Sequence, residues 1–519
     1  MKEFIIKHKQ LLIFMALVFI FFSTSLVITF DSTHYLTYLD IFEGISPWSS
    51  WDIVRGPFYP LVIFISNLIF GKSSKGLLLG MFIVYIVYCF AIYKLASYAF
   101  KDTKRKNLYT FLLCAFAYFN PVVLGYFHVM LSEYIAITLS ICSVLIGWIW
   151  PKEKKKKIRI LCSIYFILSV TFSYLVKQPY ICATFTPMFV AMIYAFINNH
   201  SIKKCTSYIV TTVLSIVVLV CSLQAWNGFL KSVGADYSTG RDGGSILNNQ
   251  VLGAVGGFKM SIVKDKYSID IDDDLTNEEK TIAYNELDEG RNVLVVSIYD
   301  NKKLLENDIV KVNDINAPSL FASLGEVFSV LFRYPKVVLG SYFANYCALT
   351  SVCKIKTDDY VTYYVSSDLD FLRLQENKEI SYRPFYDLPK QFPYPEDREN
   401  QVAFYKDPQN ASLVDYSEKL AFFPTAIIYK IVTMFFPLFL LGNIVFRVRN
   451  RKHVKDYNMY LFSSLFLYTA LITMLFNACL GAFIDRYGVT CLMLATFGII
   501  TSVLFISKNI KKVEKKKRK

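Results

Sequence analysis

Long apolar runs alternate with short polar segments along most of this chain. The first run, Leu11–Phe30, carries no charge, and its length is close to the ~20 residues needed to cross a hydrocarbon core of about 30 Å. Further runs of this kind are Leu77–Tyr98, Leu108–Leu124, Tyr134–Trp150, Ile160–Val176, Ile181–Ile197, Ser207–Trp226, Leu420–Phe446, Met459–Cys479 and Gly488–Ile506. The pattern predicts an all-α polytopic membrane protein with about ten transmembrane helices.

One apolar run is too short for this scheme. Phe58–Phe70 begins between Pro57 and Pro60, and about 13 residues is short for a membrane span. We therefore expect this segment to lie in the membrane interface or to re-enter the membrane.

A single long polar segment, 227–419, interrupts the apolar pattern. It predicts three parts: an N-terminal transmembrane module over 1–226 with an outer loop at 31–76, a mixed extracytoplasmic insert over 227–419, and a C-terminal transmembrane module over 420–519 with a basic tail. The insert is longer than many whole domains.

The net charge of +15 is spread over clusters that each adjoin an end of an apolar run. These clusters are Lys101–Lys106, Lys152–Arg159, Lys203–Lys204, Arg447–Lys455 and Lys508–Lys519. Threading the runs from a cytoplasmic start places every cluster on one side, as the positive-inside rule requires. We therefore expect a multi-pass plasma-membrane protein with both termini in the cytoplasm and no nucleic-acid partner. The first run lacks a cleavage site, so we expect it to be retained.

The eleven cysteines are scattered singly, mostly inside apolar runs, where a thiol behaves as a small apolar group. No Cys-x-x-Cys spacing predicts a metal site. Cys347 and Cys353 both fall in the insert, and whether they pair is left open. The pattern predicts no certain cofactor, and a divalent metal ion is compatible with it.

The candidate chemistry lies in the first outer loop. Asp31 ends the first apolar run, and Asp40, Glu43, Asp52 and Arg55 follow among tryptophans and tyrosines. A carboxylate at the membrane edge is costly to desolvate and is expected to have a partner or a task. A carboxylate beside a fixed cation suits deprotonation of a hydroxyl next to a phosphate leaving group. The alternative is a helix-end charge that reaches water.

Three cations fall on the predicted outer face, against the general bias. They are Arg55, Lys177 and Arg486. Arginine binds phosphate in a bidentate manner, so an anionic lipid phosphate is one candidate ligand; snorkelling to water is the other explanation. Glu133 opens a predicted helix on the same face. It either complements the helix dipole or acts as a second acid that positions an acceptor or a metal ion.

Four short motifs in chain order resemble the outer loops of the GT-C superfamily of membrane glycosyltransferases. The similarity is to its bacterial branch akin to protein mannosyltransferases and aminoarabinose transferases. The motifs are Asp31-Ser32-x-x-Tyr35 with Arg55-x-Pro57-x-Tyr59-Pro60, Asn120-Pro121 with Tyr126 and Leu131-Ser132-Glu133, Lys177-Gln178-Pro179, and Asp485-Arg486-Tyr487. The resemblance does not extend through 227–419. The paired Asp-Asp or Asp-Glu of some of these families is absent, because Ser32 follows Asp31.

The resemblance implies an inverting transfer of a sugar from a polyprenyl-phosphate carrier to an extracytoplasmic acceptor, which is a glycan, a lipid or a protein. It implies catalytic roles for Asp31 and Glu133. The donor phosphate would be bound by Arg55, Arg486 and Lys177, and the substrate by Tyr35, Tyr59 and Tyr487. Membrane lipids would surround the protein. The alternatives are a polysaccharide polymerase or ligase, and a flippase or transporter of lipid-linked sugars.

Overall fold

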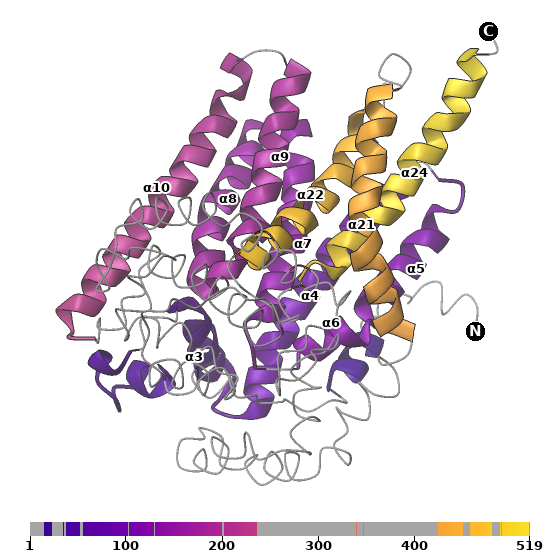
Figure 1. The fold of residues 1–519 in the computed structure, drawn as a ribbon. Coiled ribbons are helices and arrows are strands. Elements are labelled where there is room, and N and C mark those ends of the chain that lie inside the picture. Colours follow the sequence, from indigo (N-terminus) through magenta and orange to yellow (C-terminus); the bar gives the residue numbers. More distant parts are fainter. Residues whose placement is uncertain are drawn as a thin grey trace, which may run out of the picture.

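The computed structural model of the chain is a bundle of helices (Figure 1). It describes residues 15–22, 35, 38–51, 56–101, 103–128, 130–199, 202–235, 339, 346, 424–449, 457–479, 488 and 490–517. No strand occurs in this part of the chain. The predicted all-α class is therefore confirmed for the described residues, and most of the insert lies outside them.

Seven helices of the described residues are long and apolar enough to cross a membrane. Their apolar stretches are Lys75–Ala99, Glu133–Lys152, Lys156–Val176, Gln178–Phe196, Cys205–Ser232, Ile431–Arg449 and Met459–Ala478. They belong to α4 (Ser74–Ala99), α7 (Glu133–Ile149), α8 (Lys156–Val176), α9 (Ile181–Asn199), α10 (Ile202–Ser232), α21 (Pro424–Arg449) and α22 (Tyr457–Cys479). A membrane protein is supported, and the count of ten spans is not.

Two predicted spans differ in detail. Of the first run, the structure describes helix only over 15–22. The last run forms α24 (Leu492–Lys517), which continues into the basic tail, although its apolar stretch covers only Leu492–Ser507. The short run Phe58–Phe70 forms one helix, α3, with the bounds that the apolar pattern predicts.

The expected single helix over Leu108–Leu124 is wrong. Helix α5 (Lys106–Tyr118) ends before the Asn120-Pro121 pair, and α6 (Pro121–Tyr126) begins at the proline. Pro121 has no N–H to donate to the carbonyl four residues earlier. The Tyr88 hydroxyl donates to that carbonyl, on Ala117, at 3.2 Å.

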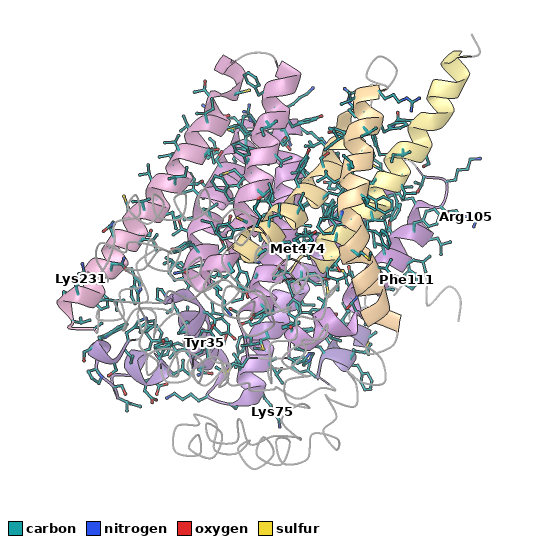
Figure 2. The ribbon with its side chains drawn as sticks, in the orientation of Figure 1. Tyr35, Lys75, Arg105, Phe111, Lys231 and Met474 are labelled. Carbon is teal, nitrogen blue, oxygen red and sulfur yellow. The ribbon has the colours of Figure 1, made fainter. Side chains whose placement is uncertain are left out.

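Helix α7 lies near the centre of the bundle and packs against α4, α8, α9 and α22 (Figure 1). Apolar residues from α4, α7, α22 and α24 share the main buried core. The end of α9, the start of α10, the end of α21, the start of α22 and the C-terminus lie at one end of the bundle. Lys75, at the start of α4, and Lys231, at the end of α10, lie toward the other end (Figure 2). The helices thus alternate in direction, and the starts of α4 and α7 share the end opposite the C-terminus.

Candidate functional site

A buried ion pair joins α7 and α8 at the end of the bundle opposite the C-terminus. The Lys177 ammonium lies 3.4 Å from Glu133 Oε1. The Glu133 side chain is fully buried, and that of Lys177 is 11% exposed. A charge is buried at this depth at a cost of several kcal/mol unless it is paired. The pair therefore holds two charges in a place that neither would occupy alone.

Local sequence explains where both residues stand. Glu133 is the first residue of α7, where a carboxylate is stabilised by the unpaired N–H groups and the dipole of the helix. Lys177 caps the C-terminal end of α8 with an extended backbone, at φ −168° and ψ 125°. Pro179 stands within the next short helix, η3 (Gln178–Tyr180), and it has no N–H to donate to the carbonyl four residues earlier, so α8 cannot continue through it. The chain therefore leaves α8 at Lys177, next to Glu133.

Three tyrosine rings, each in contact with the next, extend from the loop to the residue that follows Glu133. The ring of Tyr35 meets that of Tyr59 edge to face, with centroids 4.5 Å apart. Tyr59, near the start of α3, meets Tyr134 at 6.1 Å. All three are buried, and Tyr134 directly follows Glu133 in α7. The loop that is predicted to be the first outer loop is thereby joined to the start of α7.

The chain between that loop and α3 passes very close to the end of α8. A Cβ atom placed on Gly56 would clash with the carbonyl carbon of Leu175, at 2.6 Å, and with its oxygen. Phe58 then packs on Phe172 of α8, with centroids 5.2 Å apart. Only glycine allows the two backbones to approach this closely. The contact lies two residues before Lys177.

An aromatic cluster fixes the rest of the first outer loop. Trp51 stacks on Tyr38 at 4.2 Å and meets Trp226 of α10 at 5.2 Å. Trp48 packs on Phe229, also from α10, at 5.1 Å. Aromatic pairs of this kind contribute about 0.5–1.5 kcal/mol each beyond the area that they bury. The described part of the loop is thus held against α10.

Two acids of this loop, Asp40 and Glu43, lie among the described residues. Glu43 forms a 2.6 Å ion pair with Lys72, just after α3. Burial, together with the nearby Glu43 carboxylate, raises the pKa of Asp40, and Lys72 lowers it by less. The Asp40 carbonyl accepts hydrogen bonds from the N–H groups of Ile45 and Ser46. The Glu43–Lys72 ion pair therefore connects the loop to the end of α3, and the main-chain carbonyl of Asp40 closes the turn that follows it.

The structure brings four of the predicted site residues to one region: Tyr35, Tyr59, Glu133 and Lys177. Asp31, Arg55, Arg486 and Tyr487 lie outside the described residues, as do Cys347 and Cys353. Within the described residues, no group of three or more His, Cys, Asp or Glu side chains is arranged to hold a metal ion.

The sequence analysis missed His128, two residues after α6. Its Nδ1 lies 2.8 Å from the Leu124 carbonyl and its Nε2 lies 2.7 Å from the Phe21 carbonyl in the first helix. Burial lowers the pKa of this imidazole, and the two carbonyl contacts oppose that effect without cancelling it. A histidine at a predicted outer turn carries no signal of such a contact, because its partner is 107 positions away.

The sequence analysis also missed a set of buried polar atoms. Within the described part of the chain, no hydrogen-bond partner is present for Ser132 Oγ, Thr473 Oγ1, or either amide atom of Asn477. Ser132 directly precedes Glu133, and the other two belong to α22. An asparagine within an apolar run is a weak sequence signal of a buried polar group.

The chain was compared with protein-family models, curated proteins and solved structures, and none of them matches it. Its function therefore has to be argued from the site itself.

Proposed function

We propose that this protein is a membrane glycosyltransferase of the GT-C type that transfers a sugar from a polyprenyl-phosphate carrier to an extracytoplasmic acceptor. The observation that carries the proposal is the buried Glu133–Lys177 ion pair, at 3.4 Å, beside the three tyrosine rings that extend from the first outer loop. A purely structural role does not explain why two charges are desolvated here, since apolar residues of similar volume are often as stabilising or more so. Buried ionisable residues in membrane proteins are by default candidates for function.

The pair supplies the two kinds of group that this reaction needs. The acceptor hydroxyl oxygen attacks the anomeric carbon and forms the new bond to it. The bond from that carbon to the phosphate oxygen breaks, and the phosphate leaves with the electron pair. A carboxylate takes the hydroxyl proton, and cations stabilise the leaving phosphate. Attack from the face opposite the phosphate inverts the anomeric carbon.

In this proposal Lys177 binds the carrier phosphate together with Arg55 and Arg486. Glu133 assists the general base Asp31 by orienting the acceptor. The ammonium lies beside the carboxylate, and the carrier phosphate would give it a second anion to bind. Tyr35, Tyr59 and Tyr487 contribute ring faces and hydroxyls to the substrate. A plasma-membrane location with the site on the extracytoplasmic side belongs to the same proposal.

The test is transfer by the purified full-length protein in detergent or vesicles, with a panel of polyprenyl-phosphate sugars and chromatographic detection of the new glycosidic bond. Asp31→Asn is expected to lower the transfer rate by about 10²–10⁴-fold, the usual contribution of a general acid or base. Glu133→Gln is expected to lower it by about 10²-fold, because the acceptor is then misplaced. Glu153→Gln is the matched control, because Glu153 follows the opposite end of α7, where it accepts a hydrogen bond from the Lys155 N–H. Full activity in Asp31→Asn or in Glu133→Gln would remove the residue concerned from the mechanism.

One observation favours a second candidate, a transporter or flippase of lipid-linked sugars. The α5–α6 break interrupts an apolar run, and transporters use broken helices at their substrate sites. Movement of a labelled carrier across vesicles without any new glycosidic bond would favour this candidate. A new bond formed without such movement would exclude it.

A further inference from the structure

The buried face of α22 carries polar groups toward the end of the bundle that holds the ion pair. In its C-terminal half the buried residues recur at helical spacing, while Ile472 and Leu475 are exposed at 38% and 45%. The buried residues are Thr469, Ala470, Thr473, Met474, Asn477 and Ala478. Met474 belongs to the main core and lies at the centre of the bundle (Figure 2). Thr473 and Asn477, one turn apart, therefore face the protein interior.

This face points to the Glu133 end of the bundle. Trp148, near the C-terminus of α7, packs on Phe462 near the start of α22, with centroids 4.6 Å apart. The two helices run in opposite directions, so the last turn of α22 lies toward the end at which α7 begins with Glu133 (Figure 1). Helix α22 also contacts η3, which directly follows Lys177. Asn477 is thus brought toward both charged residues.

The amide of Asn477 is fully buried, yet neither its nitrogen nor its oxygen has a hydrogen-bond partner within the described residues. Thr473 Oγ1 also has no hydrogen-bond partner within the described residues. Each buried polar group without a partner costs about 1–3 kcal/mol. A ligand or an ordered water that completes such a group removes this cost.

Two other buried asparagines of the C-terminal helices show what a structural amide looks like in this fold. Asn443 Nδ2 donates to Ser463 Oγ at 3.0 Å and to Ser502 Oγ at 2.9 Å, which joins α21 to α22 and α24. Asn509 Nδ2 donates to the Phe505 carbonyl at 2.8 Å. Both amides use their N–H groups within the protein, although their Oδ1 atoms have no partner among the described residues. In Asn477 neither the donors nor the acceptor has a partner there.

We infer that Asn477, with Thr473, is a substrate-contacting residue that binds the hydroxyl groups of the transferred sugar. This inference rests on the proposed function and adds the headgroup subsite to it. An amide is uncharged, and it both donates and accepts, which suits the hydroxyls of a polyol better than a phosphate. Lys177 and the arginines bind the charged phosphate, and Asn477 binds the uncharged sugar. Discrimination between sugars then depends on α22.

The test compares Asn477→Leu with the matched control Asn443→Leu in the full-length purified protein. In each variant, unfolding temperature is measured alone, with polyprenyl phosphate, and with the sugar-linked carrier. Without ligand, Asn477→Leu is expected to keep or raise the unfolding temperature, because a buried unsatisfied amide is removed. Asn443→Leu is expected to lower it, because two interhelical hydrogen bonds are lost.

The ligand arms separate the inference from the function on which it rests. The wild type is expected to be stabilised more by the sugar-linked carrier than by polyprenyl phosphate. Asn477→Leu is expected to lose this difference and to raise KM for the donor at least 10-fold, while Asn443→Leu retains both wild-type values. A sugar-dependent difference retained in Asn477→Leu overturns the subsite and leaves the proposed function standing. A wild type stabilised equally by both carriers also overturns the subsite, and one stabilised by neither overturns the proposed function as well.

Discussion

The Glu133 carboxylate and the Lys177 ammonium lie 3.4 Å apart, although 44 positions separate them in the chain. The carboxylate opens α7 and the ammonium closes α8, so the contact joins the ends of two antiparallel helices. Both side chains are largely withdrawn from water. The same contact therefore contributes to the bundle and carries the proposed chemistry.

The ion pair should behave as a unit in stability measurements. Lys177→Met leaves a charged carboxylate buried without its cation, and loss of one partner of a buried pair costs about 3–5 kcal/mol. The double variant Glu133→Gln/Lys177→Met removes both charges and should recover most of that loss, without recovering transfer activity. Thermal unfolding in detergent measures the effect. Equal unfolding temperatures in the single and double variants would show that the two side chains do not interact.

The backbone contact at Gly56 should tolerate no side chain. Gly56→Ala would place a methyl group against the Leu175 carbonyl, which forces the loop or the end of α8 to shift. We expect a loss of about 1–3 kcal/mol in the free energy of unfolding, together with reduced activity through displacement of Lys177. Gly228→Ala is the control, because an added Cβ in α10 meets nothing within 4 Å. Alanine there should be neutral or stabilising by up to about 1 kcal/mol. Equal effects of the two substitutions would contradict the contact.

The α5–α6 break should depend on two tyrosines of α4. The Tyr85 hydroxyl donates to the Tyr118 carbonyl at 2.7 Å, and that of Tyr88 donates to the Ala117 carbonyl. Tyr85→Phe and Tyr88→Phe remove these donors, and each should destabilise the protein by about 1–3 kcal/mol. Tyr93→Phe, at a half-exposed position of the same helix, should have no measurable effect. A result in which all three variants unfold at the wild-type temperature would mean that the carbonyls are satisfied in another way.

The stability of the protein should fall in acid through protonation of His128, which contacts the Phe21 carbonyl. Burial holds the pKa of the folded imidazole below its ordinary value of about 6.5. The unfolded state then binds the proton more readily, so stability is complete above about pH 6.5 and falls as the pH drops toward the folded pKa. His128→Gln removes this titration. The difference in unfolding temperature between wild type and variant should therefore shrink from pH 7 to pH 5. A difference that grows in acid would mean that the charged ring, which can donate to both carbonyls, is favoured instead.

Hydropathy alone was sufficient to predict the helical class and most of the helix positions. The expected runs Tyr134–Trp150 and Ile160–Val176 correspond closely to α7 and α8, and Phe58–Phe70 agrees with α3 at both ends. This succeeds because burial of a helix in an apolar medium depends on a sum over neighbouring residues, which the sequence displays directly.

Tertiary structure alone decided which side chains meet. How each helix is rotated and crossed against its neighbours decides three features. These are the ion pair of Glu133 with Lys177, the contact of His128 with the Phe21 carbonyl, and the burial of the Asn477 amide. Rotation and crossing follow from close packing of all the helices together, so no local window of sequence contains them. The break at Pro121 lies between the two cases. The proline marks the position locally, but the hydroxyls of Tyr85 and Tyr88 that satisfy the freed carbonyls come from another helix.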